Sequence, residues 1–162
     1  MRTSVAAGTG EPADNAPAQT SQSPAPCGAG QVIVGGTVMS PGMGHRGVRL
    51  SFSVVDASPP CTLSGYPGAD SGSGGPLLHA ERTPRGYLGG LPSGQDTNPV
   101  IVLDRTHGAQ AVVEGVAFDD SGNQCPTYTD LLVTPPNTTD TVTVAARIDT
   151  CRLQIHPVTA AQ

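Results

Sequence analysis

Apolar and polar residues alternate along two well-defined segments of the chain. Apolar side chains occupy every second position from Val48 to Val54, and the same spacing recurs from Thr141 to Ile148. Because successive side chains of a β-strand point to opposite faces, this period of two predicts strands with one buried face. No segment repeats its apolar residues with the 3.6-residue period of a helix, so we expect helix to be negligible.

Shorter β-like segments occupy much of the remaining chain: Gln31–Val38, Val100–Leu103, Gln110–Phe118, Tyr128–Thr134 and Arg152–His156. The continuous apolar run Val100–Leu103 predicts a strand buried on both faces, and Gly115 indicates a bulge in the next strand. We expect Gly68–Asn98, rich in Gly, Ser and Pro, to be a long loop with one or two short edge strands. The pattern predicts an all-β fold, an antiparallel β-sandwich of about seven to nine strands.

The composition limits how much of the chain can fold. The 162 residues include 21 Gly and 16 Pro but only two Phe, three Tyr and no Trp, which excludes a large aromatic core. Residues 1–26 contain one large aliphatic residue after Met1, Val5, so we expect a disordered tail rich in Pro, Ala, Ser and Thr. The folded domain is then predicted over residues 27–158, with a C-terminal tail over 159–162.

The charges exclude one class of partner. All eight basic residues are Arg, they are scattered along the chain, and the formal net charge is −5. A nucleic-acid-binding protein needs a basic patch to neutralise phosphates, so we expect no nucleic-acid partner. The sequence also contains no apolar run long enough for a transmembrane segment.

Four cysteines suggest where the domain works. Cys27, Cys61, Cys125 and Cys151 form no C-x-x-C pair and have no histidine at zinc-ligand spacing, which favours two structural disulfides. Hairpin geometry favours the pairs 27–61 and 125–151, whereas 27–151 with 61–125 fits if the first and last strands lie side by side. Disulfides need an oxidising compartment, so we expect a secreted or cell-surface protein. Residues 1–26 contain no apolar export signal, so this expectation depends on the cysteines.

The segment Cys61–Pro67, Cys-Thr-Leu-Ser-Gly-Tyr-Pro, carries a family resemblance. With the four cysteines, the Gly44-His45 step and the strand end Val133–Pro136, it resembles an actinobacterial family of secreted proteins and lipoproteins of unknown function. The resemblance implies an immunoglobulin-like β-sandwich in the cell envelope, commonly lipid-anchored, without an established activity. The chain departs from that pattern in lacking the lipobox cysteine and the tryptophan that usually precedes the third cysteine.

One motif is similar to a catalytic sequence. Asp70-Ser71-Gly72-Ser73-Gly74-Gly75-Pro76 resembles the segment around the nucleophile of trypsin-like proteases. That chemistry also needs an upstream histidine base and a buried aspartate, and the folded part is too short for two barrels. We therefore expect a flexible loop, no catalytic residues and no enzymatic activity.

Met39, Met43 and His45 form the strongest candidate for a metal site. Thioether and imidazole groups on one Gly/Pro-rich loop are the soft ligands that select Cu(I). Copper binding is therefore the alternative to the main hypothesis, which needs no cofactor. The main hypothesis is a non-catalytic cell-envelope module, surface-tethered or secreted, that binds a protein, glycan or lipid.

The remaining polar residues suggest ordinary structural roles. His79, His107 and His156 are isolated from one another in sequence, so we expect surface or strand-end histidines. Asp119–Asn123 resembles part of a calcium loop but lacks the downstream glutamate, which favours a plain turn. Asn137 begins a formal glycosylation sequon and is expected in an exposed turn.

Overall fold

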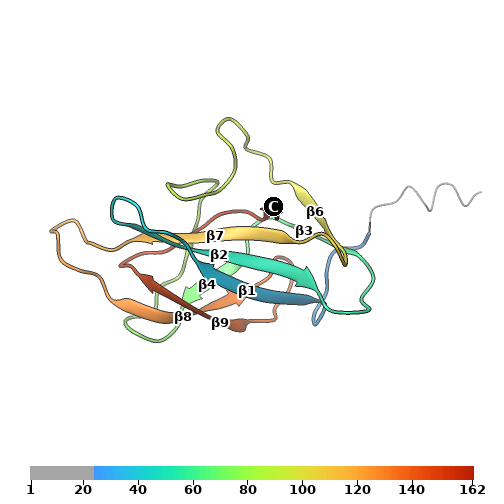
Figure 1. The fold of residues 1–162 in the computed structure, drawn as a ribbon, viewed down its shortest axis with the longest axis horizontal. Coiled ribbons are helices and arrows are strands. Elements are labelled where there is room, and N and C mark those ends of the chain that lie inside the picture. The colour runs from blue at the N-terminus through green and yellow to red at the C-terminus, as the bar shows by residue number, and fades with distance from the viewer. Residues whose placement is uncertain (1–23) are drawn as a thin grey trace, which may run out of the picture.

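A computed structural model describes residues 24–162, so most of the predicted tail over residues 1–26 lies outside the described residues. The described chain forms eleven strands and no helix, which confirms the all-β fold (Figure 1). The strands are β1 Val32–Val38, β2 His45–Val54, β3 Cys61–Ser64, β4 Gly68–Ser71, β5 Glu81–Arg82, β6 Val100–Leu103, β7 Ala109–Val116, β8 Thr127–Thr134, β9 Val142–Asp149, β10 Gln154–Ile155 and β11 Thr159–Ala160. Over the same residues, no helix is long and apolar enough to cross a membrane.

The strands form two layers (Figure 1). The larger sheet has the order β1-β2-β7-β10-β5, with β11 also paired with β7, and the smaller sheet has the order β4-β8-β9. The antiparallel pair β3 and β6 forms a separate two-stranded sheet. The pairings between strands are antiparallel except that of β10 with β5. The short β4 and β5 are the predicted edge strands within residues 68–98.

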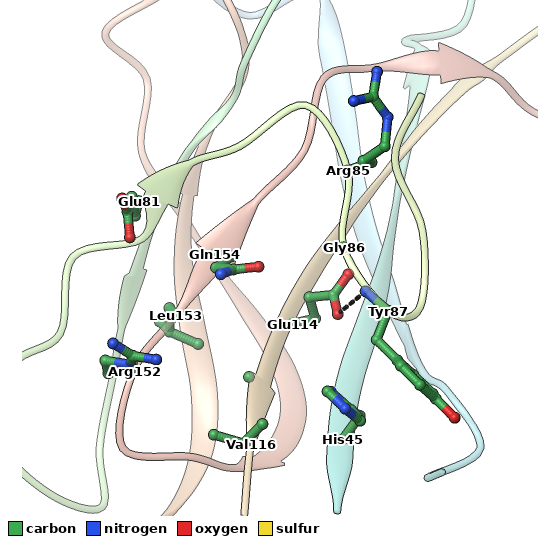
Figure 2. Close-up of a pocket in the computed structure, with 11 residues that line it drawn as sticks. His45, Glu81, Arg85, Gly86, Tyr87, Glu114, Val116, Arg152, Leu153 and Gln154 are labelled. Atoms are coloured by element: carbon green, nitrogen blue, oxygen red, sulfur yellow. Dashed lines mark hydrogen bonds between the residues drawn. The ribbon is translucent and has the colours of Figure 1, made fainter. Parts of the chain in front are cut away.

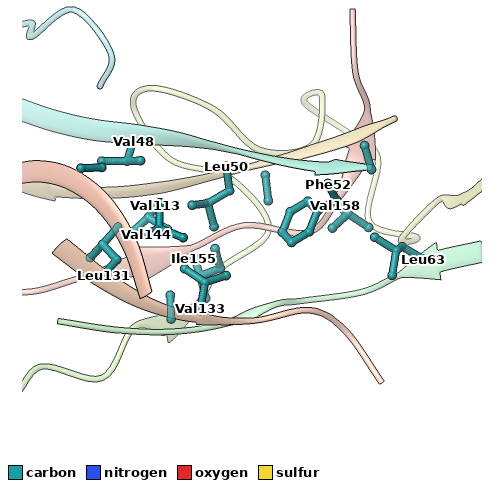
Figure 3. Close-up of a cluster of buried hydrophobic side chains, with 14 of the residues drawn as sticks. Val48, Leu50, Phe52, Leu63, Val113, Leu131, Val133, Val144, Ile155 and Val158 are labelled. Carbon is teal, nitrogen blue, oxygen red and sulfur yellow. The ribbon is translucent and has the colours of Figure 1, made fainter. Parts of the chain in front are cut away.

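The core lies between the two layers (Figure 3). Val48, Leu50 and Phe52 of β2 are at most 1 % exposed, whereas the alternating Arg49 and Ser51 are exposed. The smaller sheet packs against them with the buried side chains Leu131, Val133 and Val144. Burying one such aliphatic or aromatic side chain stabilises the fold by about 1.5–3 kcal/mol. The alternation in sequence therefore identified the inner face of β2 correctly.

Each disulfide closes one hairpin-like unit. Cys27, before β1, pairs with Cys61 at the start of β3, and Cys125, before β8, pairs with Cys151 after β9. The Cα–Cα distances are 4.8 and 5.0 Å. This is the pairing between neighbours along the chain, the arrangement that hairpin geometry favours. Each bridge adds about 2–4 kcal/mol of stability.

The prediction that Val100–Leu103 is buried on both faces is wrong. Val100 is 64 % and Val102 40 % exposed, whereas Leu103 is fully buried. The reason is position, because β6 pairs only with β3 and lies at a sheet edge where one face meets solvent. An apolar run alone does not report whether a second layer covers it.

Three further expectations differ from the structure. Within residues 159–162, expected to be a tail, Thr159 and Ala160 pair with β7 as β11. Pro26, at the end of the predicted N-terminal tail, forms a bridge with Thr62. The pairing of β2 with β7 continues through Gly115 without a bulge. A register shift occurs instead in the pairing of β8 with β9, between Tyr128 and Asp130. Backbone pairing at strand ends depends on neighbours that are distant in sequence, which local patterns do not contain.

Candidate functional site

A loop over residues 83–91, which we call the covering loop, lies on the outer face of the larger sheet. It follows β5 and belongs to the segment that extends beyond the sheet at the top of Figure 1. Leu91 of this loop and Val112 of β7 are 3 % and 7 % exposed, although neither belongs to the core between the sheets. The loop therefore creates a second buried region on a face that would otherwise meet solvent.

A buried acid and a buried histidine meet beneath the covering loop. Glu114 of β7 and His156, directly after β10, are 3 % and 0 % exposed. Their Oε2 and Nε2 atoms are 2.5 Å apart, and His156 Nδ1 lies 2.9 Å from the carbonyl oxygen of Thr83. Oγ1 of Thr83 also lies 3.0 Å from Nδ1, so Thr83 contacts this ring nitrogen through two oxygens.

The same carboxylate fixes the covering loop in place. Glu114 Oε1 accepts a hydrogen bond from the backbone N–H of Tyr87 at 3.0 Å (Figure 2). It accepts a second one from the backbone N–H of Leu88 at 3.1 Å. Gly86 permits this approach, because a Cβ atom there would lie 2.4 Å from Glu114 Oε2. Gly86 and the Glu114–His156 pair therefore hold the loop backbone directly on the sheet.

A cavity of about 410 Å³ opens beside the covering loop. Its floor includes a row of residues in register across three strands, Glu81 of β5, Gln154 of β10 and Glu114 of β7. At its edge the rings of His45 and Tyr87 stack in parallel, with centroids 3.9 Å apart (Figure 2). Tyr87 is 57 % exposed, so the stack is accessible to a ligand.

Comparison with known proteins identifies the family of this domain. Residues 27–159 match the family described as a domain of unknown function, DUF4232. The chain belongs to the DUF4232 family. Neither a curated protein nor a solved structure matches it. The match includes both disulfides and every residue of the cavity, so the site lies wholly within the DUF4232 domain.

The DUF4232 domain distributes the three copper candidates around one hairpin. Met43 lies in the turn between β1 and β2 with a positive φ of 52° and is 87 % exposed. Met39 lies against Gly47 on the outer face of β2. A Cβ atom added to Gly47 would be 3.2 Å from the Met39 sulfur. His45 occupies the same face and stacks on Tyr87. Within residues 24–162, no group of three or more His, Cys, Asp or Glu residues could hold a metal ion.

The protease-like motif has a packing role in the DUF4232 domain. The two residues Asp70 and Ser71 point to opposite faces of β4, so Ser71 is buried while Asp70 pairs with the exposed His79. Ser71 Oγ accepts a hydrogen bond from the N–H of Leu78 at 2.7 Å. Gly74 lies against β8 so closely that a Cβ atom would be 2.1 Å from a backbone oxygen. The motif therefore forms a tight backbone contact.

His156 lies at a strand end, directly after β10, as one of the two expected settings, but it is fully buried rather than at the surface. The sequence contained one indirect signal, a single charge inside the apolar strand Ala109–Val116. A buried carboxylate requires a partner, so Glu114 implied a donor from elsewhere in the chain. Which residue supplied it depended on the pairing of β10 with β7.

The other polar candidates lie in exposed turns. His107 and the backbone N–H of Thr106 both donate to Asp104. The N–H of Thr106 first, and then the His107 side chain, lower the pKa of Asp104 to about 2. Backbone N–H groups of the turn, chiefly that of Asn123, lower the pKa of Asp119. Asn137 is exposed in a turn with positive φ, as expected from the sequon.

Proposed function

We propose that this DUF4232 domain is a non-catalytic binding module that works outside the cytoplasm, secreted or held at the cell surface. Its two disulfides support an oxidising compartment, because such bridges are rare in reducing cytosol. The cavity beside the covering loop is its binding site. The partner is a component of the cell envelope.

The buried Glu114–His156 pair is the observation that carries this proposal. Replacing a buried ionisable pair by apolar residues is often neutral or stabilising, so the pair is a poor device for stability alone. The pair is instead bonded to the covering loop that borders the cavity, through Thr83, Tyr87 and Leu88. Here the pair fixes the backbone of Tyr87 and Leu88, which places Tyr87 against His45 at the cavity edge. Its role is to preorganise a binding surface.

The hydrogen bonds of the pair also support the non-catalytic part of the proposal. His156 uses Nδ1 on Thr83 and Nε2 on Glu114. Glu114 uses both oxygens on His156 and the covering loop. A general base must reach a proton of the substrate within hydrogen-bond distance. Both groups already have partners on their polar atoms, so they act as positioning residues.

The proposal is tested by sedimentation of the full-length protein with the cell-envelope fraction of the producing cells. Tyr87→Ala removes the accessible ring but keeps the backbone N–H that binds Glu114. Leu77→Ala is the matched control, because Leu77 is similarly exposed, 61 % against 57 %, and lies outside the cavity. We expect Tyr87→Ala to weaken binding at least tenfold and Leu77→Ala to leave it unchanged. Absence of envelope binding, or equal loss in both variants, contradicts the proposal.

Copper binding is a second candidate, supported by the turn at Met43. Residues other than glycine rarely adopt a positive φ, as Met43 does, and such backbone strain is concentrated at functional sites. Met39 and His45 share the outer face of the same hairpin. The test is competition for Cu(I) against a coloured chelator, with Met43→Leu as the variant. Removal of copper by the wild type but not by the variant supports this candidate, and an unchanged chelator spectrum excludes it.

A further inference from the structure

The hydrogen-bonding groups around the cavity are mixed in kind. Arg152 can only donate, Glu81 can only accept and Gln154 can do both. Within residues 24–162, none of these three side chains has a hydrogen bond or salt bridge to another residue. Gln154 and Glu81 lie side by side in register, and Arg152 lines the same cavity. The three groups are therefore available to one ligand.

This mixture discriminates between classes of ligand. A phosphate or another anion would need donors alone, and the carboxylate of Glu81 would repel it. A cation would need acceptors alone, and Arg152 would oppose it. A hydroxyl group both donates and accepts, so several neighbouring hydroxyl groups satisfy all three side chains at once.

The aromatic stack adds a flat surface beside these polar groups. The planes of His45 and Tyr87 differ by 2°, so one face of each ring is covered by the other, while Tyr87 as a whole is 57 % exposed. Both residues line the cavity together with Arg152 and Gln154 (Figure 2). A flat apolar ligand face can pack on such a ring while its polar edge reaches the hydrogen-bonding groups.

From these features we infer that the cavity binds a saccharide, with a sugar ring against the His45–Tyr87 stack and its hydroxyl groups on Glu81, Arg152 and Gln154. This inference rests on the proposed function and names the chemistry of the envelope component. The volume of about 410 Å³ falls within the range of sites for small ligands.

The test is an amide NMR titration of the full-length protein with four probes: maltotriose, the trimer of N-acetylglucosamine, free alanine and inorganic phosphate. We expect a saturable shift of cavity amides with at least one trisaccharide and none with phosphate or alanine. Arg152→Ala should weaken that binding at least tenfold. Arg105→Ala, which removes an arginine outside the cavity, should leave it unchanged. Failure of both trisaccharides, or cavity shifts with alanine or phosphate alone, overturns the inference.

A second arm separates this inference from the proposed function. The envelope fraction is treated with periodate, which cleaves the carbon–carbon bond of vicinal diols, and the sedimentation assay is repeated. Loss of Tyr87-dependent binding after treatment supports a saccharide. Undiminished Tyr87-dependent binding, together with no cavity shift from the trimer of N-acetylglucosamine, whose internal 1,4-linked rings lack vicinal diols, overturns the saccharide and leaves the binding module intact. If untreated envelope does not bind the domain, the proposed function itself fails.

Discussion

Replacing Glu114 by Ala removes the central member of the buried network. The change leaves His156 Nε2 without its partner at a residue that is fully buried. It also removes the acceptor of the Tyr87 and Leu88 N–H groups. We expect the covering loop to lose its attachment to the sheet while the core between the two sheets keeps its packing.

The magnitude follows from the groups left without partners. Leaving one buried polar group unsatisfied costs about 1–3 kcal/mol, and breaking a buried pair by removing one member costs about 3–5 kcal/mol. We therefore expect Glu114→Ala to lower the free energy of unfolding by about 3–5 kcal/mol. Glu114→Gln keeps an oxygen for the two N–H groups and places an NH2 donor beside His156 Nε2. Its expected loss is about 1 kcal/mol or less.

Urea unfolding with both disulfides intact measures these differences, and hydrogen exchange locates them. In Glu114→Ala, the amides of Tyr87 and Leu88 should lose protection before those of β2 and β8. A Glu114→Ala loss below about 1 kcal/mol would refute the reasoning, as would an equal loss in Glu114→Gln. In the second case the carboxylate charge, rather than the hydrogen-bond pattern, would hold the loop.

Two further predictions concern the turns. Gly74→Ala should destabilise the fold by about 1–3 kcal/mol in urea unfolding, because the new Cβ meets the backbone of β8 at a φ of +133°. In Gly28→Ala the new Cβ would make an ordinary 3.5 Å contact, so the free energy of unfolding should change by less than about 0.5 kcal/mol. Equal losses in Gly74→Ala and Gly28→Ala would contradict this account. The pKa of Asp104 is lowered from 3.8 to about 2, so its contribution to stability is present above pH 3.8 and is lost as the pH falls through about 2. An NMR titration of wild-type Asp104 should give a pKa of about 2, and this pKa should rise in His107→Ala. A wild-type pKa of 3.8 would contradict the prediction.

Local patterns were sufficient where a residue's environment follows from its own strand. The alternation from Val48 to Val54 determined which face of β2 is buried, because a period of two assigns alternate side chains to opposite faces. The same information failed at Val100–Leu103. Burial of the second face depends on whether another layer covers it, and the composition of the run does not contain that fact.

The sequence by itself determined the all-β class, the inner face of the principal strand and the availability of four cysteines for two bridges. Only the tertiary structure decided the site. Glu114 and His156 are 42 residues apart in sequence. The loop amides that bind Glu114 lie 26 and 27 residues before it. Their meeting requires β10 to pair with β7 and with β5 in one sheet. Contacts of this kind are set by strand order, which depends on the free energy of the whole chain rather than on any local pattern.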